Sequence, residues 1–220
     1  MSNPQNAAAP LVFTPSERVL LFGDRFAKPA GMMGYGEVVL TSGAKVSADD
    51  LAVHAIAAAF LACEQAGAVR LEPRQGKAMF GLMKTSDVHV VPGQRMVHWP
   101  EGSLESWIVQ GAQGGPKVGD LSQRLLATRQ VNSPSQTMFA RLKGALAQRG
   151  ILHGQQKTAL AVFTSVEYTL PGHARAAAEH GGTQHVHAML ESCRHQRPQL
   201  WNDLTKAIRA AITWMTTSND

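Results

Sequence analysis

The sequence of 220 residues has only two cysteines, few aromatic residues and no long apolar run. Cys63 and Cys193 form no CxxC pair, so they supply neither a disulfide framework nor a cysteine-based zinc motif. No stretch of about 18 apolar residues occurs, which excludes a membrane-spanning helix. The first ten residues lack a basic segment followed by an apolar one, so we expect no signal peptide and a cytoplasmic protein.

The sequence also lacks the short motifs of common enzyme classes. It contains no GxSxG, no HExxH and no kinase-like set of motifs. Residues 111–119, GAQGGPKVG, are rich in glycine but match neither the phosphate-binding nor the dinucleotide-binding motif, which indicates a connecting loop. We therefore expect no catalytic activity and no cofactor.

Five of the nine histidines lie between residues 173 and 195, close to Cys193. Histidine and cysteine are common zinc ligands. The surrounding sequence TQHVHAMLESCRHQ indicates a helix, on which His185 and His187 would point about 200° apart. That arrangement is poor for chelation, so we interpret the segment as an exposed polar helix and expect no metal site.

What the chain does have is the composition of a globular protein with a basic balance. It is 44% hydrophobic and 17% charged, with a formal net charge of +5 and a pI near 9.5. A positive balance favours acidic partners, such as phosphate head groups or nucleic acid.

Two segments of the chain repeat one pattern, in which a helix ends at a glycine and an apolar strand follows. They are FLACEQAGAVRL at 60–71, with Gly67, and FARLKGALAQRGIL at 139–152, with Gly150. The first helix is apolar almost all round, which predicts that it is central and buried. A hairpin with its turn between Pro73 and Gly76 follows it. The second helix is followed by Ile151 and Leu152, a polar turn, and a strand over 159–170.

The pattern predicts a mainly α fold with β-hairpins, in which winged-helix-like helix–Gly–hairpin units surround a central buried helix. Residues 1–12 are predicted to form a flexible tail, and residues 13–220 a single domain, with a subdivision near 111–119 as the alternative. Thr14 and Glu17 form a capping box for the first helix, and breaks at 181–182 and at Pro198 divide the helical C-terminal part.

The candidate binding residues belong to the two units. The helix of the second unit offers Arg141, Lys143 and Arg149 as a basic face, and Arg74 and Lys77 belong to the first hairpin. The second hairpin carries a lysine next to apolar side chains, a combination that fits a membrane surface or a subunit interface. These hairpin residues are Lys157, Leu160, Val162 and Phe163.

The order of these motifs resembles the Golgi phosphoprotein 3 family, which has bacterial members. The matching segments cover about residues 13–175 and are TPSERVLLFGD, FLACEQAGAVRLE, LESWI, FARLKGALAQRGIL and TALAVFTSVEY. The resemblance implies a mostly helical fold with β-hairpins, peripheral membrane association and recognition of phosphatidylinositol 4-phosphate. In this family the hairpin after the RGIL-like motif inserts into the bilayer and supports self-association; here it corresponds to about residues 152–166.

The head-group pocket of the family has a different composition here. An ungapped match places its tryptophan at Ser47 and its arginines at Ile56, Gln136 and Phe139. We therefore predict a protein that binds anionic phospholipid, a phosphoinositide or another, from the inner membrane face, without that family's pocket. Homo-oligomerisation is a further expectation. The alternatives are a tandem winged-helix protein that binds nucleic acid and a non-catalytic scaffold or assembly protein.

Overall fold

The computed structural model describes residues 12–31, 36–78, 83–127, 133–159, 163–180 and 182–217, and for 76–78, 83–85, 157–159 and 163–165 it describes the backbone alone. The elements, in chain order, are α1 (Pro15–Leu21), the 3-10 helix η1 (Gly23–Arg25), β1 (Glu37–Val39), β2 (Lys45–Ser47), α2 (Ala48–Gln65), β3 (Val69–Ala78), β4 (Met83–Pro92), α3 (Leu104–Gly111), α4 (Val118–Leu126), α5 (Pro134–Gln148), β5 (His153–Ala159), β6 (Phe163–Thr169), α6 (Gly172–Glu179), α7 (Gly182–Gln196) and α8 (Pro198–Thr217).

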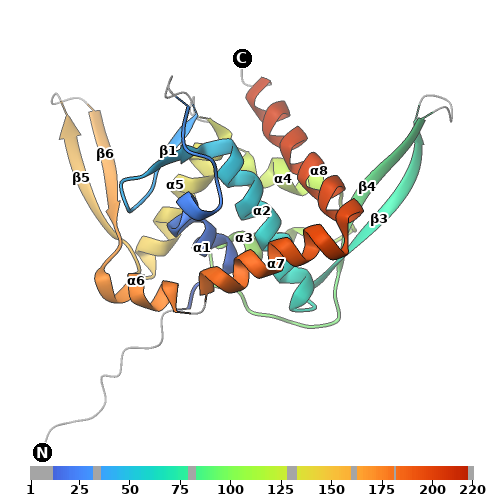
Figure 1. Cartoon of the computed structure of the whole chain (residues 1–220), viewed down its shortest axis with the longest axis horizontal. Coiled ribbons are helices and arrows are strands. Elements are labelled where there is room, and N and C mark those ends of the chain that lie inside the picture. Colours follow the sequence, from blue (N-terminus) through green and yellow to red (C-terminus); the bar gives the residue numbers. More distant parts are fainter. Residues whose placement is uncertain are drawn as a thin grey trace, which may run out of the picture.

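Helix α2 lies at the centre of the molecule, and the other helices pack around it (Figure 1). Nearly every residue of α2 from Leu51 to Cys63 is buried, so this helix has no polar face for solvent. Buried side chains from α1, α3, α4, α5, α7 and α8 join it in one hydrophobic cluster. The prediction of a mainly α protein with β-hairpins around a central buried helix is confirmed.

Local sequence signals set the ends of several helices. The Thr14 hydroxyl accepts a hydrogen bond from the Glu17 backbone N–H, and the Glu17 carboxylate accepts one from the Thr14 N–H, which completes the predicted capping box of α1. Ser47 caps α2 in a similar way through the Asp50 N–H. Gly67 and Gly150 follow α2 and α5 with φ values of 76° and 70°, a conformation that favours glycine.

The strands form three separate antiparallel pairs: β1–β2, β3–β4 and β5–β6. The predicted turn between Pro73 and Gly76 is wrong, because β3 continues through both residues and pairs Pro73 with Val88. Proline is tolerated there since β3 is an edge strand, which needs no N–H on its outer side. The polar segment after Leu152 is also not a turn, since residues 153–159 form β5 opposite β6.

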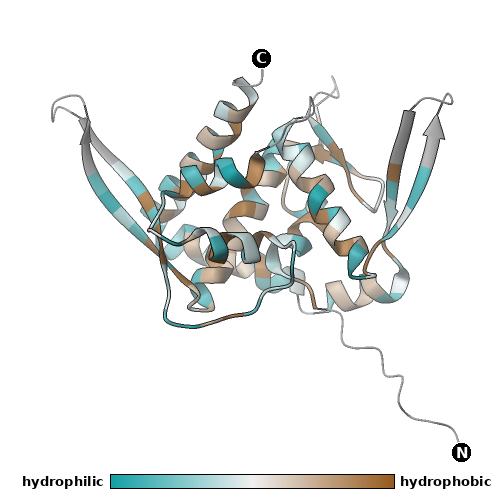
Figure 2. Ribbon diagram, turned by 180° about the vertical axis from the view of Figure 1, so that it is seen from behind, coloured by the Kyte–Doolittle hydropathy of each residue, from teal (hydrophilic) through white to brown (hydrophobic). Residues whose placement is uncertain are grey.

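The two long hairpins lie at opposite ends of the helical body (Figure 1). Both point away from the body toward the same side, and the C-terminal end of α8 points to that side as well. Figure 2 shows that apolar residues concentrate in the helices and at the bases of the hairpins. The C-terminal segment divides into α6, α7 and α8 as predicted, and α8 buries its apolar stripe: Leu200, Leu204, Ile208, Ile212 and Met215.

The predicted flexible tail, residues 1–12, lies outside the described residues apart from Val12. The single-domain prediction for residues 13–220, with its alternative division near 111–119, stays a prediction. The glycine-rich loop itself is found where we expected it, between Gly111 at the end of α3 and Val118 at the start of α4.

Candidate functional site

The three basic residues of α5 do not form one face. The Arg141 guanidinium donates to the Ala127 carbonyl at 2.7 Å, and the Lys143 ammonium donates to the Val39 carbonyl at 2.8 Å. Arg149 instead pairs with Glu17 of α1. Each cation is therefore directed to a different neighbouring element, and the binding role predicted for the three residues stays a prediction.

The contact between Arg149 and Glu17 belongs to a buried polar network at the start of α1. Glu17 and Glu105 are both fully buried. The Glu105 carboxylate accepts hydrogen bonds from the Ser16 N–H at 2.9 Å and from the Ser16 hydroxyl at 2.7 Å. Burial raises the pKa of Glu105, and the Ser16 hydrogen bonds oppose that shift. The network joins α1, α3 and α5, so we assign Arg149 a structural role.

The remaining predicted residues belong to the two long hairpins. The Arg74 guanidinium lies 3.1 Å from the Glu72 carboxylate in β3. Lys77, Lys157 and Phe163 lie in β3, β5 and β6, and the structure describes their backbone alone. Leu160 and Val162 lie outside the described residues. Since the hairpins lie at opposite ends of the body, Arg74 and Lys77 do not join the second hairpin in one site (Figure 1).

Lys143 lines a cavity of about 410 Å³ between the β1–β2 hairpin, α5 and β6. Val39, Val166 and Tyr168 also line it, and the hydroxyl of Thr41 is buried there with no hydrogen-bond partner among the described residues. Burial lowers the pKa of the Lys143 ammonium. This cavity is where one predicted basic residue meets the predicted hairpin.

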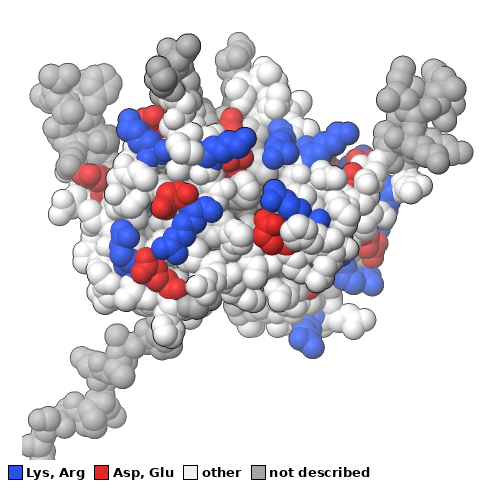
Figure 3. Space-filling model, in the orientation of Figure 1, with Lys and Arg blue, Asp and Glu red and all other residues white. Residues whose placement is uncertain are grey.

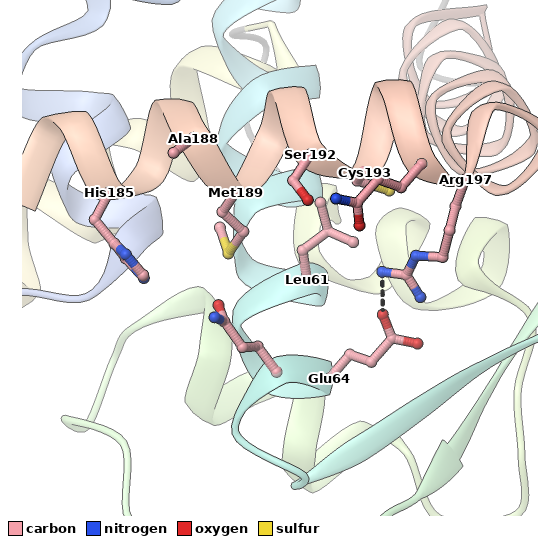
Figure 4. Close-up of a pocket in the computed structure, with 10 residues that line it drawn as sticks. Leu61, Glu64, His185, Ala188, Met189, Ser192, Cys193 and Arg197 are labelled. Carbon is pink, nitrogen blue, oxygen red and sulfur yellow. Dashed lines mark hydrogen bonds and ion pairs between the residues drawn. The ribbon is translucent and has the colours of Figure 1, made fainter.

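A second cavity, of about 490 Å³, lies between the C-terminal end of α2 and α7 (Figure 4). Glu64 of α2 pairs there with Arg197 at 2.7 Å and also accepts the Leu71 N–H at 3.2 Å. Burial raises the pKa of the Cys193 thiol. His185 lies eight residues earlier on α7, about 12 Å along the helix axis, and Figure 4 shows it away from the thiol. This geometry provides no cysteine–histidine pair for nucleophilic chemistry.

The stretch TQHVHAMLESCRHQ lies in α7, a helix as predicted, and its residues His185, His187 and His195 are exposed. His173 lies in α6, and His180 follows that helix. In the described part of the chain, no group of three or more His, Cys, Asp or Glu side chains is placed to hold a metal ion. Within the same residues, no helix combines the length and the apolar character needed to cross a bilayer.

The side toward which the hairpins point combines exposed apolar and basic groups. Trp214, in the last turn of α8, is 52% exposed, and Val166 of β6 is 47% exposed. Figure 3 shows Lys and Arg side chains along the upper part of the visible face, below the hairpins. Tryptophan and cations are the residue types that contact membrane interfaces.

No family model matches the chain, and no curated protein matches it significantly. The resemblance to the Golgi phosphoprotein 3 family therefore stays a prediction.

Sequence reasoning missed two features of the surface. No sequence pattern marks Trp214 as an exposed residue at the end of α8. Lys28 and Arg209 line one cleft although they are far apart in the sequence. No local spacing brings these two residues together, so only the tertiary structure reveals the cleft.

Proposed function

We propose that the protein is a peripheral membrane protein that binds anionic phospholipid through the side to which β3–β4, β5–β6 and the end of α8 point. The shared direction of these three elements carries the proposal (Figure 1). A flat bilayer can contact both hairpins and the end of α8 at once only if they project from one side of the body. The formal net charge of +5 adds long-range attraction to acidic lipid.

The exposed side chains support contact with the interface between water and lipid. Trp214 offers a large ring with a polar N–H, which suits the level of the head groups. Each Lys or Arg close to an anionic surface adds about 1 kcal/mol, and salt weakens this term. Shallow contact of this kind needs no membrane-spanning helix.

The residues at the positions of the resembled family's pocket have structural roles in this fold. Ile56 and Phe139 are buried in the core, and Gln136 donates to the Glu37 carbonyl at 2.7 Å. Nearby, the Ser135 hydroxyl donates to the Asp49 carboxylate at 2.7 Å. A carboxylate at this place repels phosphate, which supports binding to anionic lipid in general rather than selection of one phosphoinositide there.

The alternative of a tandem winged-helix protein has less support. In such a protein the helix before the hairpin enters the DNA groove. Here α2 is buried from Leu51 to Cys63 apart from His54, so it cannot serve the first unit in this way. An interface between copies is the second alternative, because exposed Val39 and Val166 both lie beside the cavity at Lys143.

Co-sedimentation with vesicles tests the proposal. The panel contains neutral, phosphatidylserine-rich and phosphoinositide-containing vesicles, at low and high salt. We expect binding to both anionic kinds, weakened by salt. We also expect Trp214→Asp and Phe163→Asp to weaken it roughly tenfold, since each places a carboxylate next to acidic lipid.

Met96→Asp is the matched control. Met96 is 90% exposed, and the loop between β4 and α3 that carries it runs along the opposite side of the body (Figure 1). The control should bind vesicles as well as the parent does. Equal loss in all three variants, or no binding to any anionic vesicle at low salt, would remove the proposal. Light scattering of the same variants separates lost self-association from lost lipid binding.

A further inference from the structure

A third surface feature is a cleft of about 710 Å³ between η1, α2, α7 and α8. Its lining includes Lys28 from the segment after η1, Asp50 and His54 from α2, and Arg194, Trp201 and Arg209 from the C-terminal helices. A volume of this size suits a small-molecule ligand. The described lining residues of this cleft belong neither to the two long hairpins nor to the cavity at Lys143.

Two cations of the cleft have no acidic partner among the described residues. Arg25 lies 3.7 Å from Glu179, and Arg194 lies 2.9 Å from Glu191. In the part of the chain that the structure describes, neither the Lys28 ammonium nor the Arg209 guanidinium has a carboxylate within 4.0 Å. Both side chains are exposed toward solvent. They therefore offer unused charged donors to an anion.

The same cleft offers acceptors. The His54 Nδ1 lies 2.8 Å from the Asp50 carbonyl oxygen, which can only accept, so Nδ1 donates the proton. In the neutral ring Nε2 is then an acceptor. The Asp50 Oδ2 accepts the Lys28 backbone N–H at 3.0 Å, and Oδ1 is left to accept a further hydrogen bond. An inorganic anion would use the donors only, whereas a ligand with hydroxyl groups would use both kinds of group.

We propose that this cleft binds a soluble phosphate monoester of a polyol, such as a sugar phosphate. The phosphate lies between Lys28 and Arg209, and ligand hydroxyls donate to Asp50 and His54. A nucleotide fits less well. The guanidinium of Arg194 lies over the Trp201 ring at 5.4 Å, so that face is not available to stack on a base.

Isothermal titration calorimetry with glucose 6-phosphate tests the inference, with glucose and inorganic phosphate as reference ligands. We expect glucose 6-phosphate to bind more tightly than either reference. Lys28→Gln and Arg209→Gln should each weaken it roughly tenfold, because each removes a charged hydrogen bond. Neither side chain has a hydrogen-bond or ion-pair partner within the described part of the chain, so both variants should fold, and circular dichroism checks this.

Lys206→Gln is the matched control, because Lys206 is exposed on α8 and does not line the cleft. This variant loses the same charge and should change the affinity less than twofold. Three results would overturn the inference: no heat with glucose 6-phosphate at millimolar concentration, affinity no better than that of inorganic phosphate, or equal weakening in the control.

A vesicle experiment separates a soluble ester from a lipid head group. Phosphatidic acid also carries a phosphate monoester, so vesicles that contain it present the same phosphate at a membrane. If such vesicles bind in a manner that needs Lys28 and Arg209 while glucose 6-phosphate gives no heat, the cleft is a lipid site and the proposal of a soluble ligand is wrong. Competition by glucose 6-phosphate against these vesicles would support it.

Discussion

The two helix–Gly–hairpin units have the same order of elements but differ in how their hairpins contact the helical body. In the first unit, β4 is tied to the rest of the molecule by the Val90 N–H, which donates to the Pro116 carbonyl at 2.8 Å, and by Ser86, whose hydroxyl donates to Asp203 at 2.7 Å. In the second, a cavity of about 410 Å³ separates β6 from β1 and α5. The same sequence pattern therefore produces one hairpin braced against α8 and one with little packing behind it.

The ends of the two unit helices differ in a related way. Each ends in a charged residue that pairs with another helical segment: Glu64 of α2 with Arg197, and Arg149 after α5 with Glu17. The arginine side chain is 47% exposed in the first pair and 22% exposed in the second. The glutamate side chain is 19% exposed in the first pair and 0% exposed in the second, so the pair of the second unit is the more buried one.

We expect the largest effect at the base of the first unit, from Gly93→Ala. A Cβ atom at Gly93 would lie 2.1 Å from the Gly67 carbonyl oxygen, and backbone cannot move aside as a flexible side chain can. Relieving this clash would break two hydrogen bonds at the base of the hairpin. In these bonds the Gly93 N–H donates to the Ala68 carbonyl and the Arg95 N–H donates to the Gly67 carbonyl. We predict a loss of about 3–5 kcal/mol in the free energy of unfolding, measured by urea titration.

Gly31→Ala is the control for this variant, because a Cβ at Gly31 would meet no atom within 4 Å. The control should be nearly neutral. A small effect of Gly93→Ala would mean that the strand ends at Gly67 and Gly93 are not held close together in solution.

The second prediction compares the two ion pairs directly. Arg149→Met leaves the buried Glu17 carboxylate without its cation and should cost about 2–4 kcal/mol. Arg197→Met leaves a partly exposed Glu64 and should cost about 1 kcal/mol or less. Thermal unfolding of both variants at pH 7 measures the difference. Equal losses would contradict the contrast between a buried and an exposed pair.

Local signals set the starts of α1 and α2, whereas pairing between residues distant in the sequence decided the hairpins. Thr14 with Glu17, and Ser47 with Asp50, act within one turn, so their sequence spacing is sufficient. Pro73 and Gly76 carry a turn signal, but the register from Val69 to Ala78 against Met83 to Pro92 overrides it. A two-stranded ribbon has a free edge at which such residues are tolerated.

The candidate binding residues were the least predictable from sequence. Arg141 and Lys143 lie in α5 and Arg149 follows directly after it. Their partners are nevertheless Ala127, Val39 and Glu17, which belong to three other segments. The position of a charged residue in the sequence does not indicate which carbonyl or carboxylate it will contact in the fold. For the same reason, only the structure shows that Lys28 and Arg209 line the same cleft.

The third prediction contrasts the two buried glutamates at the start of α1. Glu17 has a cation, whereas Glu105 has hydrogen bonds alone, and burial raises its pKa. A raised carboxyl pKa in the folded state favours the protonated form. Its contribution to stability is therefore complete below the unfolded value, near pH 4, and is lost as the pH rises toward the folded value.

Glu105→Gln tests the direction of this pH dependence of stability. The amide of the variant can still accept from the Ser16 N–H and donate to the Ser16 hydroxyl. We expect the variant to be more stable than the parent at pH 7 and to lose that advantage near pH 4. Urea unfolding at the two pH values measures it. A variant that is less stable at pH 7 would mean that the ionised carboxylate is favourable in its buried place.

The smallest expected effects distinguish two glycines of the second unit. A Cβ would meet no atom within 4 Å at either Gly144, inside α5, or Gly150, after it. Steric space therefore does not distinguish the effects of alanine at the two positions, whereas backbone conformation does. Gly144→Ala should stabilise the protein by about 0.5–1 kcal/mol, because alanine favours the helix and restricts the unfolded chain.

Gly150→Ala should destabilise the protein by about 1 kcal/mol, since φ is 70° at this position and a side chain is strained there. Paired thermal melts of the two variants measure opposite shifts in Tm. Shifts of the same sign would show that α5 does not end at Gly150 in the left-handed conformation. The hairpin of the second unit would then leave the helix in another direction, and its orientation toward the side of β3–β4 and α8 would have to be revised.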